Sequence, residues 1–292
     1  MAGIGLMLAA VVLFSLNDTL GKWLVASYTV AQILFLRSSA ALVMMSPFVV
    51  RTGWAAYRDM PRPWMQLARV VLASVETACF YFAVWYMPLA DAMTFYMAGP
   101  IYVTALSAIF LREKVGPYRW GAVLVGFVGV VIVLDPSSGV IGPGALIALF
   151  GSFCYAVLMV ATRKLRDTDS VVMATTQMAC SLVIGAVGIL FAWTPVTAPD
   201  LALLFLLGIV AVGAIMCVNQ SLKLAPASVV VPFQYTMIVW AIFFGYFVFG
   251  DVPRLHMLVG AAIIIASGLF IFLREQRLTR GAAPVVVELP PG

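Results

Sequence analysis

The chain has 292 residues, of which 64% are hydrophobic and only 10% are charged. Soluble domains are about 45–50% apolar and about 25% charged, so one soluble core could not bury this much apolar surface. The excess of 17 basic over 12 acidic residues is small and lies mostly in loops between apolar segments, which does not indicate nucleic-acid binding.

Ten apolar segments follow one another, each about long enough to cross the ~30 Å hydrocarbon core of a bilayer as an α-helix. Their apolar runs are continuous rather than alternating, which favours helices over the strands of a β-barrel. The N-terminus lacks a basic region and a small-residue cleavage site, so we expect no cleaved signal peptide. The predicted spans are 3–21, 30–50, 64–86, 90–111, 116–134, 142–162, 170–193, 200–222, 227–249 and 253–273.

Polar residues interrupt the first two spans at a similar depth. Asn17 and Asp18 lie in the outer part of the first span, and Arg37 lies in the second. Asp18 either meets Lys22 one helical turn later or faces a water-filled cavity. Arg37 either extends toward the membrane surface or pairs with Asp18. Because a charge inside a membrane normally has a partner, we expect Asp18 and Arg37 to lie within salt-bridge reach.

The third span carries the deepest charge of the sequence, Glu76, about twelve residues from its inner end and so roughly 18 Å deep. An ionised carboxylate at this depth costs ~2.5–3.5 kcal/mol on insertion scales, so it must be protonated or meet a cation. Glu76 either makes a structural hydrogen bond or serves a substrate or proton site, and the cost favours the second interpretation. Arg69, near the inner end, is expected to extend toward the membrane surface.

A short turn at residues 87–89 leads into the fourth span, which Asp91 opens and Pro100 interrupts. Residues 121–134 of the fifth span include no polar side chain, and residues 260–273 of the tenth are similar. Both contain glycines that permit close helix packing, so we expect these two spans to be packing elements outside any cavity. The glycines concerned are Gly121, Gly126, Gly129, Gly260 and Gly268.

The second half repeats the first at offsets of 137 to 141 residues: the sixth span resembles the first, and the eighth and ninth resemble the third and fourth. Five spans in each half is an odd number, so the second copy enters the membrane from the opposite side. Such inverted repeats are typical of secondary transporters, whose site lies between the repeats near the bilayer midplane. We predict one repeat over 1–135, a second over 136–273 and a flexible cytoplasmic tail over 274–292.

The two halves differ in charge, since the second offers neutral hydrogen-bonding groups, among them Gln177, where the first has carboxylates and an arginine. One wall of the predicted cavity would therefore carry charges and the other amides and hydroxyls. The candidate substrate-binding or coupling residues are Glu76, Asp18, Arg37, Asn17, Asp91, Phe80, Tyr102, Tyr155, Asn219, Gln220, Gln234 and Tyr235.

The placement of Lys and Arg predicts the orientation. With the N-terminus in the cytoplasm, thirteen of these residues fall on the cytoplasmic side and two, Lys22 and Arg254, on the other, while Arg37 and Arg69 lie inside spans. This asymmetry predicts that both termini are cytoplasmic. The thirteen are Arg51, Arg58, Arg62, Arg112, Lys114, Arg119, Arg163, Lys164, Arg166, Lys223, Arg274, Arg277 and Arg280.

Catalytic motifs are missing from the sequence. It has no G-x-x-x-x-G-K-[ST] for ATP, no H-E-x-x-H for zinc and no G-x-S-x-G for a serine nucleophile. His256 is the single histidine, and the four cysteines all fall within spans without a C-x-x-C pair. We therefore expect no enzyme, no cofactor, no metal site and no nucleic-acid partner.

Several segments, taken together and in order, resemble the EamA-type transporters of the drug/metabolite transporter superfamily. They are FSLNDTLGKWL, YFAVWYMPLADA, the mid-helix Pro100 and IFLREKV in the first half, and QSLKLAPASVVVPF and VFGDVP in the second. The resemblance implies a ten-helix basket of two inverted five-helix repeats around a central cavity. It implies ATP-independent movement of small metabolites, with Glu113 and Asp251 as structural residues at helix ends.

The first-half segments look closest to a subgroup that includes bacterial S-adenosylmethionine and riboflavin carriers. We therefore expect a secondary transporter of the bacterial inner membrane, surrounded by lipid and present as a monomer or homodimer. Its substrate should be small, polar and zwitterionic or aromatic, with a proton as a candidate coupling ion. The alternatives are an exporter of amino acids or toxic compounds and, in another class, a channel or a non-transporting membrane scaffold.

Overall fold

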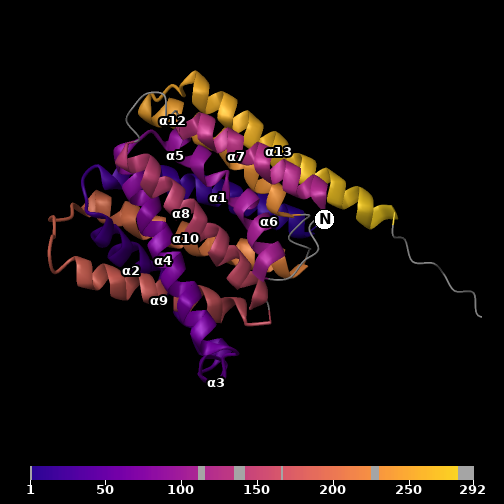
Figure 1. Cartoon of the computed structure of the whole chain (residues 1–292). Coiled ribbons are helices and arrows are strands. Elements are labelled where there is room, and N and C mark those ends of the chain that lie inside the picture. The colour runs from indigo at the N-terminus through magenta and orange to yellow at the C-terminus, as the bar shows by residue number, and fades with distance from the viewer. Residues whose placement is uncertain (1, 111–115, 135–141, 166, 225–229, 282–292) are drawn as a thin grey trace, which may run out of the picture.

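The computed structural model describes residues 2–110, 116–134, 142–165, 167–224 and 230–281, and within them all regular secondary structure is helical (Figure 1). Glu113, expected to be structural, lies outside these residues. The helices are α1 (Ala2–Val25), α2 (Val30–Thr52), α3 (Ala55–Arg58), α4 (Pro63–Tyr86), α5 (Leu89–Tyr96), α6 (Gly99–Phe110), α7 (Pro117–Leu134), α8 (Pro143–Lys164), α9 (Ser170–Gly188), α10 (Ala198–Leu224), the 3₁₀-helix η2 (Val231–Thr236), α12 (Met237–Phe249) and α13 (Leu255–Gly281).

Local sequence signals set several helix ends. Thr29 caps α2 by accepting a hydrogen bond from the Gln32 amide, and Asp169 caps α9 through the Val171 amide. Pro63 occupies the first position of α4, where its missing N–H costs nothing. Gly250 ends α12 at φ 69°, a left-handed conformation that favours glycine.

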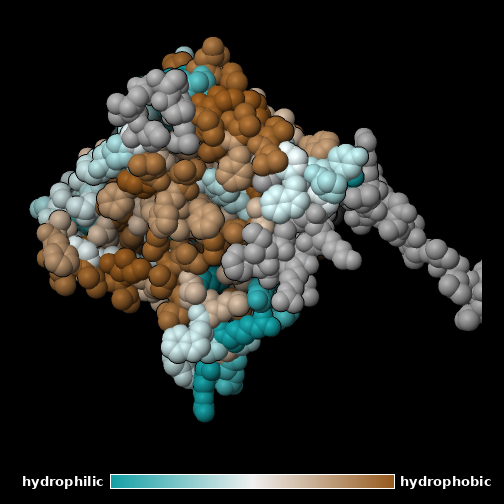
Figure 2. Space-filling model, viewed as in Figure 1, coloured by the Kyte–Doolittle hydropathy of each residue, from teal (hydrophilic) through white to brown (hydrophobic). Residues whose placement is uncertain are grey.

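Six of the described helices are long and apolar enough to cross a membrane: α1, α2, α4, α8, α9 and residues 198–221 of α10. Shorter apolar stretches lie in α7, α12 and α13. Many large apolar side chains of these helices are exposed, and Figure 2 shows them covering most of the visible face, with hydrophilic residues gathered around α3. Lipid is the solvent that such a surface requires, so the chain is a multi-pass membrane protein.

Exposed aromatic side chains gather near the helix ends. Trp54 and Trp64 flank α3, and Trp64 lies at the start of α4. Trp23 and Trp85 lie near the C-terminal ends of α1 and α4. Tryptophan is enriched where the hydrocarbon meets the headgroups, because its ring is apolar and its N–H seeks water. The two groups therefore mark the two faces of the membrane-embedded region.

Each of the ten predicted spans overlaps at least one helix, with two differences in detail. The fourth span is divided into α5 and α6 by a turn at Met97 and Ala98, just ahead of Pro100, which cannot donate a helical hydrogen bond. The ninth contains η2 before α12. Helix α13 continues to Gly281, so the start of the segment predicted to be a flexible tail is helical.

Helices from the two halves of the sequence pack against each other in pairs: α1 on α10, α2 on α9, α4 on α8, α5 on α12 and α7 on α13. The last pair runs side by side in Figure 1. The largest buried apolar cluster draws on both halves, with Ile33, Tyr81 and Phe95 from one and Leu204 and Ile264 from the other. The core is therefore built between the halves.

Glycine allows the close approach of α7 and α13. A Cβ atom at Gly129 would lie 3.0 Å from the Gly260 carbonyl oxygen and 2.9 Å from Ile264. Gly121, expected to share this role, has no such neighbour within 4 Å. Gly121 lies nearer the start of α7. Of the three glycines in α7, only Gly126 and Gly129 therefore bring this helix close to its neighbours.

Candidate functional site

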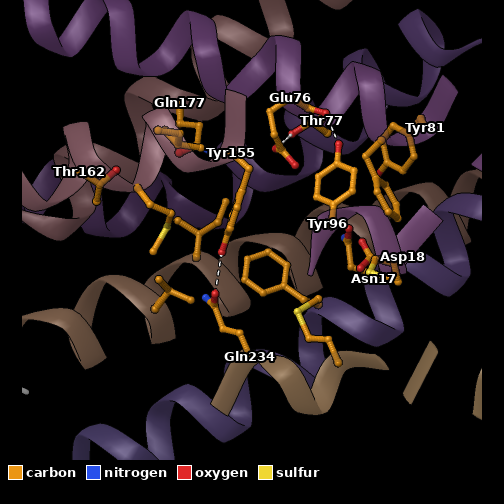
Figure 3. Close-up of a pocket in the computed structure, with 18 of the residues that line it drawn as sticks. Asn17, Asp18, Glu76, Thr77, Tyr81, Tyr96, Tyr155, Thr162, Gln177 and Gln234 are labelled. Atoms are coloured by element: carbon orange, nitrogen blue, oxygen red, sulfur yellow. Dashed lines mark hydrogen bonds between the residues drawn. The ribbon is translucent and has the colours of Figure 1, made fainter. Parts of the chain in front are cut away.

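A cavity of about 140 Å³ lies between the two halves (Figure 3). Its charged lining residues, Asp18, Arg37, Arg69 and Glu76, all come from the first half. The rest of the lining is aromatic, apolar or neutral and polar: Phe14, Asn17, Thr77, Phe80, Tyr81, Met93, Tyr96, Met97, Tyr155, Leu158, Met159, Thr162, Gln177, Ile215, Val218, Asn219, Gln234 and Met237.

Glu76 lies midway along α4 and faces the cavity. Its carboxylate accepts a hydrogen bond from the Thr77 hydroxyl at 3.3 Å, and the Tyr96 hydroxyl donates to the Glu76 backbone carbonyl at 3.3 Å. Figure 3 shows the carboxylate directed into the space between Tyr155 and Tyr96. Among the described residues no cation lies within 4.0 Å of it, so a positive group or a proton has to come from elsewhere.

Arg37 is not paired with Asp18, contrary to the expectation from sequence. Its Nη1 donates to the Tyr81 hydroxyl at 2.5 Å, and its guanidinium lies 5.6 Å from the centre of that ring. Its Nε has no hydrogen-bond partner in the described part of the chain. Tyr81 can reach this place because it packs against Gly21, where a Cβ atom would overlap the ring. A tyrosine thus takes the position expected for a carboxylate, and Asp18 remains on the cavity wall without a salt bridge.

Arg69 does not extend to the membrane surface as expected. The side chain is 1% exposed and lines the cavity. It donates from Nη2 to the Met173 carbonyl at 2.6 Å, from Nη1 to Gln177 Oε1 at 3.2 Å and from Nε to Gln66 Oε1 at 3.3 Å. The reason is its neighbour α9, whose carbonyl and amide oxygens provide the acceptors that the membrane surface was expected to supply.

Neutral amides complete the wall. Asn17 donates to the Leu207 carbonyl at 3.0 Å and so ties α1 to α10. Gln234 accepts from the Tyr155 hydroxyl at 3.1 Å, which joins α8 to η2 (Figure 3). Asn219 is 8% exposed, and its Nδ2 has no hydrogen-bond partner among the described residues. One buried amide donor on the cavity wall is therefore unsatisfied.

Three of the candidate residues, Asp91, Tyr102 and Gln220, do not line the cavity with the others. Asp91 lies in the first turn of α5 and shares its electrostatic surroundings with Lys22, Asp251, Arg254 and His256 rather than with the cavity. Tyr102 packs on Phe127 and Phe153, and Gln220 is exposed because the next position on a helix turns about 100° away from Asn219. The side chain of Tyr235 lies outside the described residues.

Lys22 forms a salt bridge with Asp251 at 2.5 Å, rather than the alternative contact with Asp18 one turn earlier. Its ammonium also lies 4.5 Å from the centre of the Phe249 ring, which in turn packs on Trp23. The bridge joins the last turn of α1 to the loop after α12. The two halves are therefore tied at this end by charge and by aromatic contact.

Sequence reasoning missed several lining residues, above all Arg69, Tyr81 and Tyr96. A usable signal existed for Arg69, which is seven positions from Glu76 and so on the same face of α4 two turns away. For the two tyrosines the signal is weak, because a tyrosine in an apolar span more often faces lipid headgroups or a helix interface.

Comparison with known proteins agrees with this architecture. The EamA-like transporter family matches residues 1–135 and 142–273. The chain is 29% identical to a riboflavin transporter of Rhizobium johnstonii, over 95% of this chain and 93% of that one, and 28% identical to an S-adenosylmethionine uptake transporter of Rickettsia bellii, over 94% of each. A crystal structure that is 18% identical superposes with a TM-score of 0.64 over 94% of this chain and 98% of that one, which supports the fold. The chain therefore belongs to the EamA-like transporter family, and it is a transporter rather than an enzyme.

Proposed function

We propose that the protein is a secondary transporter that moves a small polar metabolite across the bacterial inner membrane by alternating access. The observation that carries this proposal is the cavity between the two halves, which places two carboxylates and two guanidinium groups among aromatic rings. A substrate with charged and aromatic parts would find a partner for each on these walls.

The two curated relatives are named for riboflavin and for S-adenosylmethionine, so those molecules and amino-acid-like compounds are the first substrates to test. Both relatives are bacterial, which supports the inner membrane as the location. Basic residues are more numerous around α3 and in the other loops predicted on the same side of the membrane as the N-terminus. This excess supports a cytoplasmic position for both termini.

The pairing of helices supports two inverted five-helix repeats with boundaries at 1–135 and 136–273. If each helix is replaced by its counterpart in the other half, the packed pair α1 and α10 becomes α8 and α4, which also pack together. The pairs α2 with α9, α5 with α12 and α7 with α13 each consist of two counterparts, so the replacement leaves them unchanged. A pseudo-twofold axis between the halves produces this pattern. Rocking of one repeat against the other is the motion that such an axis allows.

Glu76 is the residue we assign to coupling. In its ionised form, the Glu76 carboxylate attracts a cationic group of the substrate. In its protonated form, the carboxyl group can remain in the cavity without a partner when the site is empty. Alternation between these two states would link substrate movement to a proton. Asp18, on the wall contributed by α1, would share the negative field that a cation meets.

Uptake into proteoliposomes tests the proposal. Purified protein should accumulate radiolabelled S-adenosylmethionine or riboflavin with saturable kinetics, and an imposed pH gradient should change the accumulation. Glu76→Gln preserves shape and hydrogen bonding but cannot titrate. We expect this variant to insert and fold normally and to lose most concentrative uptake, while exchange of substrate across the membrane persists.

Thermal unfolding and gel filtration of Glu76→Gln serve as the folding control. Wild-type rates with unchanged pH dependence in the variant would remove Glu76 from the mechanism. Flux that does not saturate would favour a channel, and the absence of any flux with a broad metabolite panel would favour a scaffold.

A further inference from the structure

Arg69 differs from the other buried charges of the cavity in the way it is held. Three of its five N–H donors bond to two amide oxygens and a backbone carbonyl, all of them neutral. Among the described residues no carboxylate lies within 4.0 Å of the guanidinium. The cavity wall therefore contains a fixed, almost fully buried positive charge that no carboxylate in the described part of the chain neutralises.

A structural role alone does not explain this arrangement. Cross-links between α4 and α9 need only neutral partners, as the hydrogen bond between the Ser74 and Ser181 hydroxyls at 2.8 Å shows. A buried cation is costly, and it is retained inside membranes mainly at substrate and ion pathways. The second N–H of Nη1 and that of Nη2 have no acceptor among the described residues, and a carboxylate accepts such a pair in the bidentate geometry that arginine favours.

The position of Arg69 on α4 defines what could bind. Arg69 and Glu76 are seven residues apart and face the same cavity, so two helical turns, roughly 10 Å, separate their backbone positions. Gln177, the acceptor for Arg69, and Thr162 lie on one side of Glu76 in Figure 3, and Asn17 and Asp18 lie on the other. Arg69 therefore lies toward one end of the cavity, while Arg37, bonded to Tyr81, lies toward the other end with Asp18. With Glu76 between them, the end away from Arg69 has two carboxylates against one guanidinium and keeps an excess of negative charge.

We propose that Arg69 binds the carboxylate of a zwitterionic substrate whose positive group lies toward Glu76 and Asp18. This inference rests on the proposed transport function and narrows the substrate class: a molecule with a carboxylate and a cationic group fits both ends. A neutral molecule such as riboflavin would leave the guanidinium without an anion. Asn219, with its unpartnered Nδ2, adds a neutral donor to the same cavity.

Two ligands that differ only in the carboxylate test the inference on the wild-type protein. S-adenosylmethionine carries the carboxylate, and decarboxylated S-adenosylmethionine keeps the sulfonium, the amine and the adenine ring. Dissociation constants come from ligand-dependent thermal shifts of the purified protein. We expect S-adenosylmethionine to bind at least about tenfold more tightly, since a charge-assisted hydrogen bond to guanidinium is lost with the carboxylate.

Two variants locate the preference. Arg69→Gln should weaken S-adenosylmethionine about tenfold or more and leave the decarboxylated ligand unchanged or tighter. Because removal of Arg69 also removes bonds to α9, Gln177→Glu provides an independent variant. It retains the acceptor of the 3.2 Å bond to Nη1, is nearly isosteric, and neutralises the guanidinium where it stands. It should abolish the carboxylate preference while the protein remains folded.

The outcomes separate the inference from the proposed function. Equal affinity for the two ligands, or a preference that survives in both variants, overturns the role of Arg69 while transport stands. Binding of riboflavin without binding of S-adenosylmethionine overturns the zwitterionic substrate class and again leaves transport intact. Failure of all three ligands to bind or to be transported contradicts the proposed substrates, and the inference is overturned with them.

Discussion

The hydroxyl group of Tyr81 accepts a hydrogen bond from the buried guanidinium of Arg37, and this contact joins α4 to α2. A hydrogen bond to a charged group contributes about 1.5–3 kcal/mol, and its loss leaves a charge unpaired in a dry environment. Arg37 is 5% exposed, so little solvent reaches the guanidinium to replace the hydroxyl. Tyr81 therefore has a larger part in holding Arg37 than the nearby carboxylate of Asp18 has.

A pair of double-mutant cycles tests this assignment. Tyr81→Phe should destabilise the protein by about 1.5–3 kcal/mol, and in the Arg37→Gln background the same change should cost much less. Asp18→Asn combined with Arg37→Gln should show a smaller coupling, because those groups form no salt bridge. Unfolding free energies in mixed micelles provide the measurement. A larger coupling for Asp18 than for Tyr81 would show that the pairing expected from sequence was correct.

Sequence alone could identify Glu76 as the central carboxylate, because a charge twelve residues into an apolar span is costly wherever its neighbours lie. It could not identify the partners of Arg37 or Arg69. Both form bonds to residues more than forty positions away, Tyr81 in one case and Met173 and Gln177 in the other. Depth along a span is predictable from sequence, whereas the direction in which a long side chain extends depends on which helix packs beside it.

At the scale of helices, the contact between α2 and α10 depends on a missing side chain. A Cβ atom at Gly208 would overlap the backbone carbonyl oxygen of Arg37, and a backbone group cannot move aside as a flexible side chain can. Gly213, in the same helix, has only the Leu13 side chain at 3.4 Å from the position of its Cβ atom, an ordinary contact. The two glycines offer a matched pair of sites.

Gly208→Ala should force α10 away from α2 and destabilise the protein by about 1–3 kcal/mol, the usual cost of overpacking. Gly213→Ala should be neutral or slightly stabilising, because alanine is the better helix former. Thermal unfolding of both variants in one detergent gives the comparison. Equal stability of the two variants would show that the approach of the helices at Gly208 is looser than the structure indicates.

Helix positions were predictable because apolar length and hydrophobic continuity determine insertion into a bilayer. The break between α5 and α6 was also predictable, since Pro100 removes a backbone donor. The 3₁₀ geometry of η2 was not, because no comparable local signal distinguishes it within an apolar run. Which helices pack against each other could not be predicted either, because in lipid the shape of the side chains, rather than their hydrophobicity, determines which helices associate.

On the scale of the whole molecule, charge and aromatic residues give the protein two distinct ends. Arg58 and Trp54 belong to the end around α3, where hydrophilic side chains gather in Figure 2. Lys22 and Asp251 form their bridge at the other end, in the last turn of α1 and the loop after α12. The greater number of basic residues near α3 supports the proposal that the α3 end is cytoplasmic.

Cysteine labelling tests this orientation. Ala55→Cys in α3 and Val252→Cys in the loop after α12 both place a thiol at an exposed position. A membrane-impermeant maleimide should label Val252→Cys in intact cells and Ala55→Cys only after the cells are opened. The background should be low, because Cys79, Cys154, Cys180 and Cys217 are buried or half-buried. Labelling of Ala55→Cys in intact cells would reverse the orientation.

The packing of each helix against the opposite half has a consequence for how the protein is made. When residues 1–135 have left the ribosome and entered the bilayer, α1, α2 and α4 still lack the helices against which they mainly pack. The carbonyl groups of Met173 and Leu207, which later accept bonds from Arg69 and Asn17, have not yet been synthesised. Insertion and assembly are therefore separate stages. We therefore expect the first half to remain in the lipid as loosely associated helices until the second half is inserted, and two halves produced as separate polypeptides to assemble through these same helix pairs.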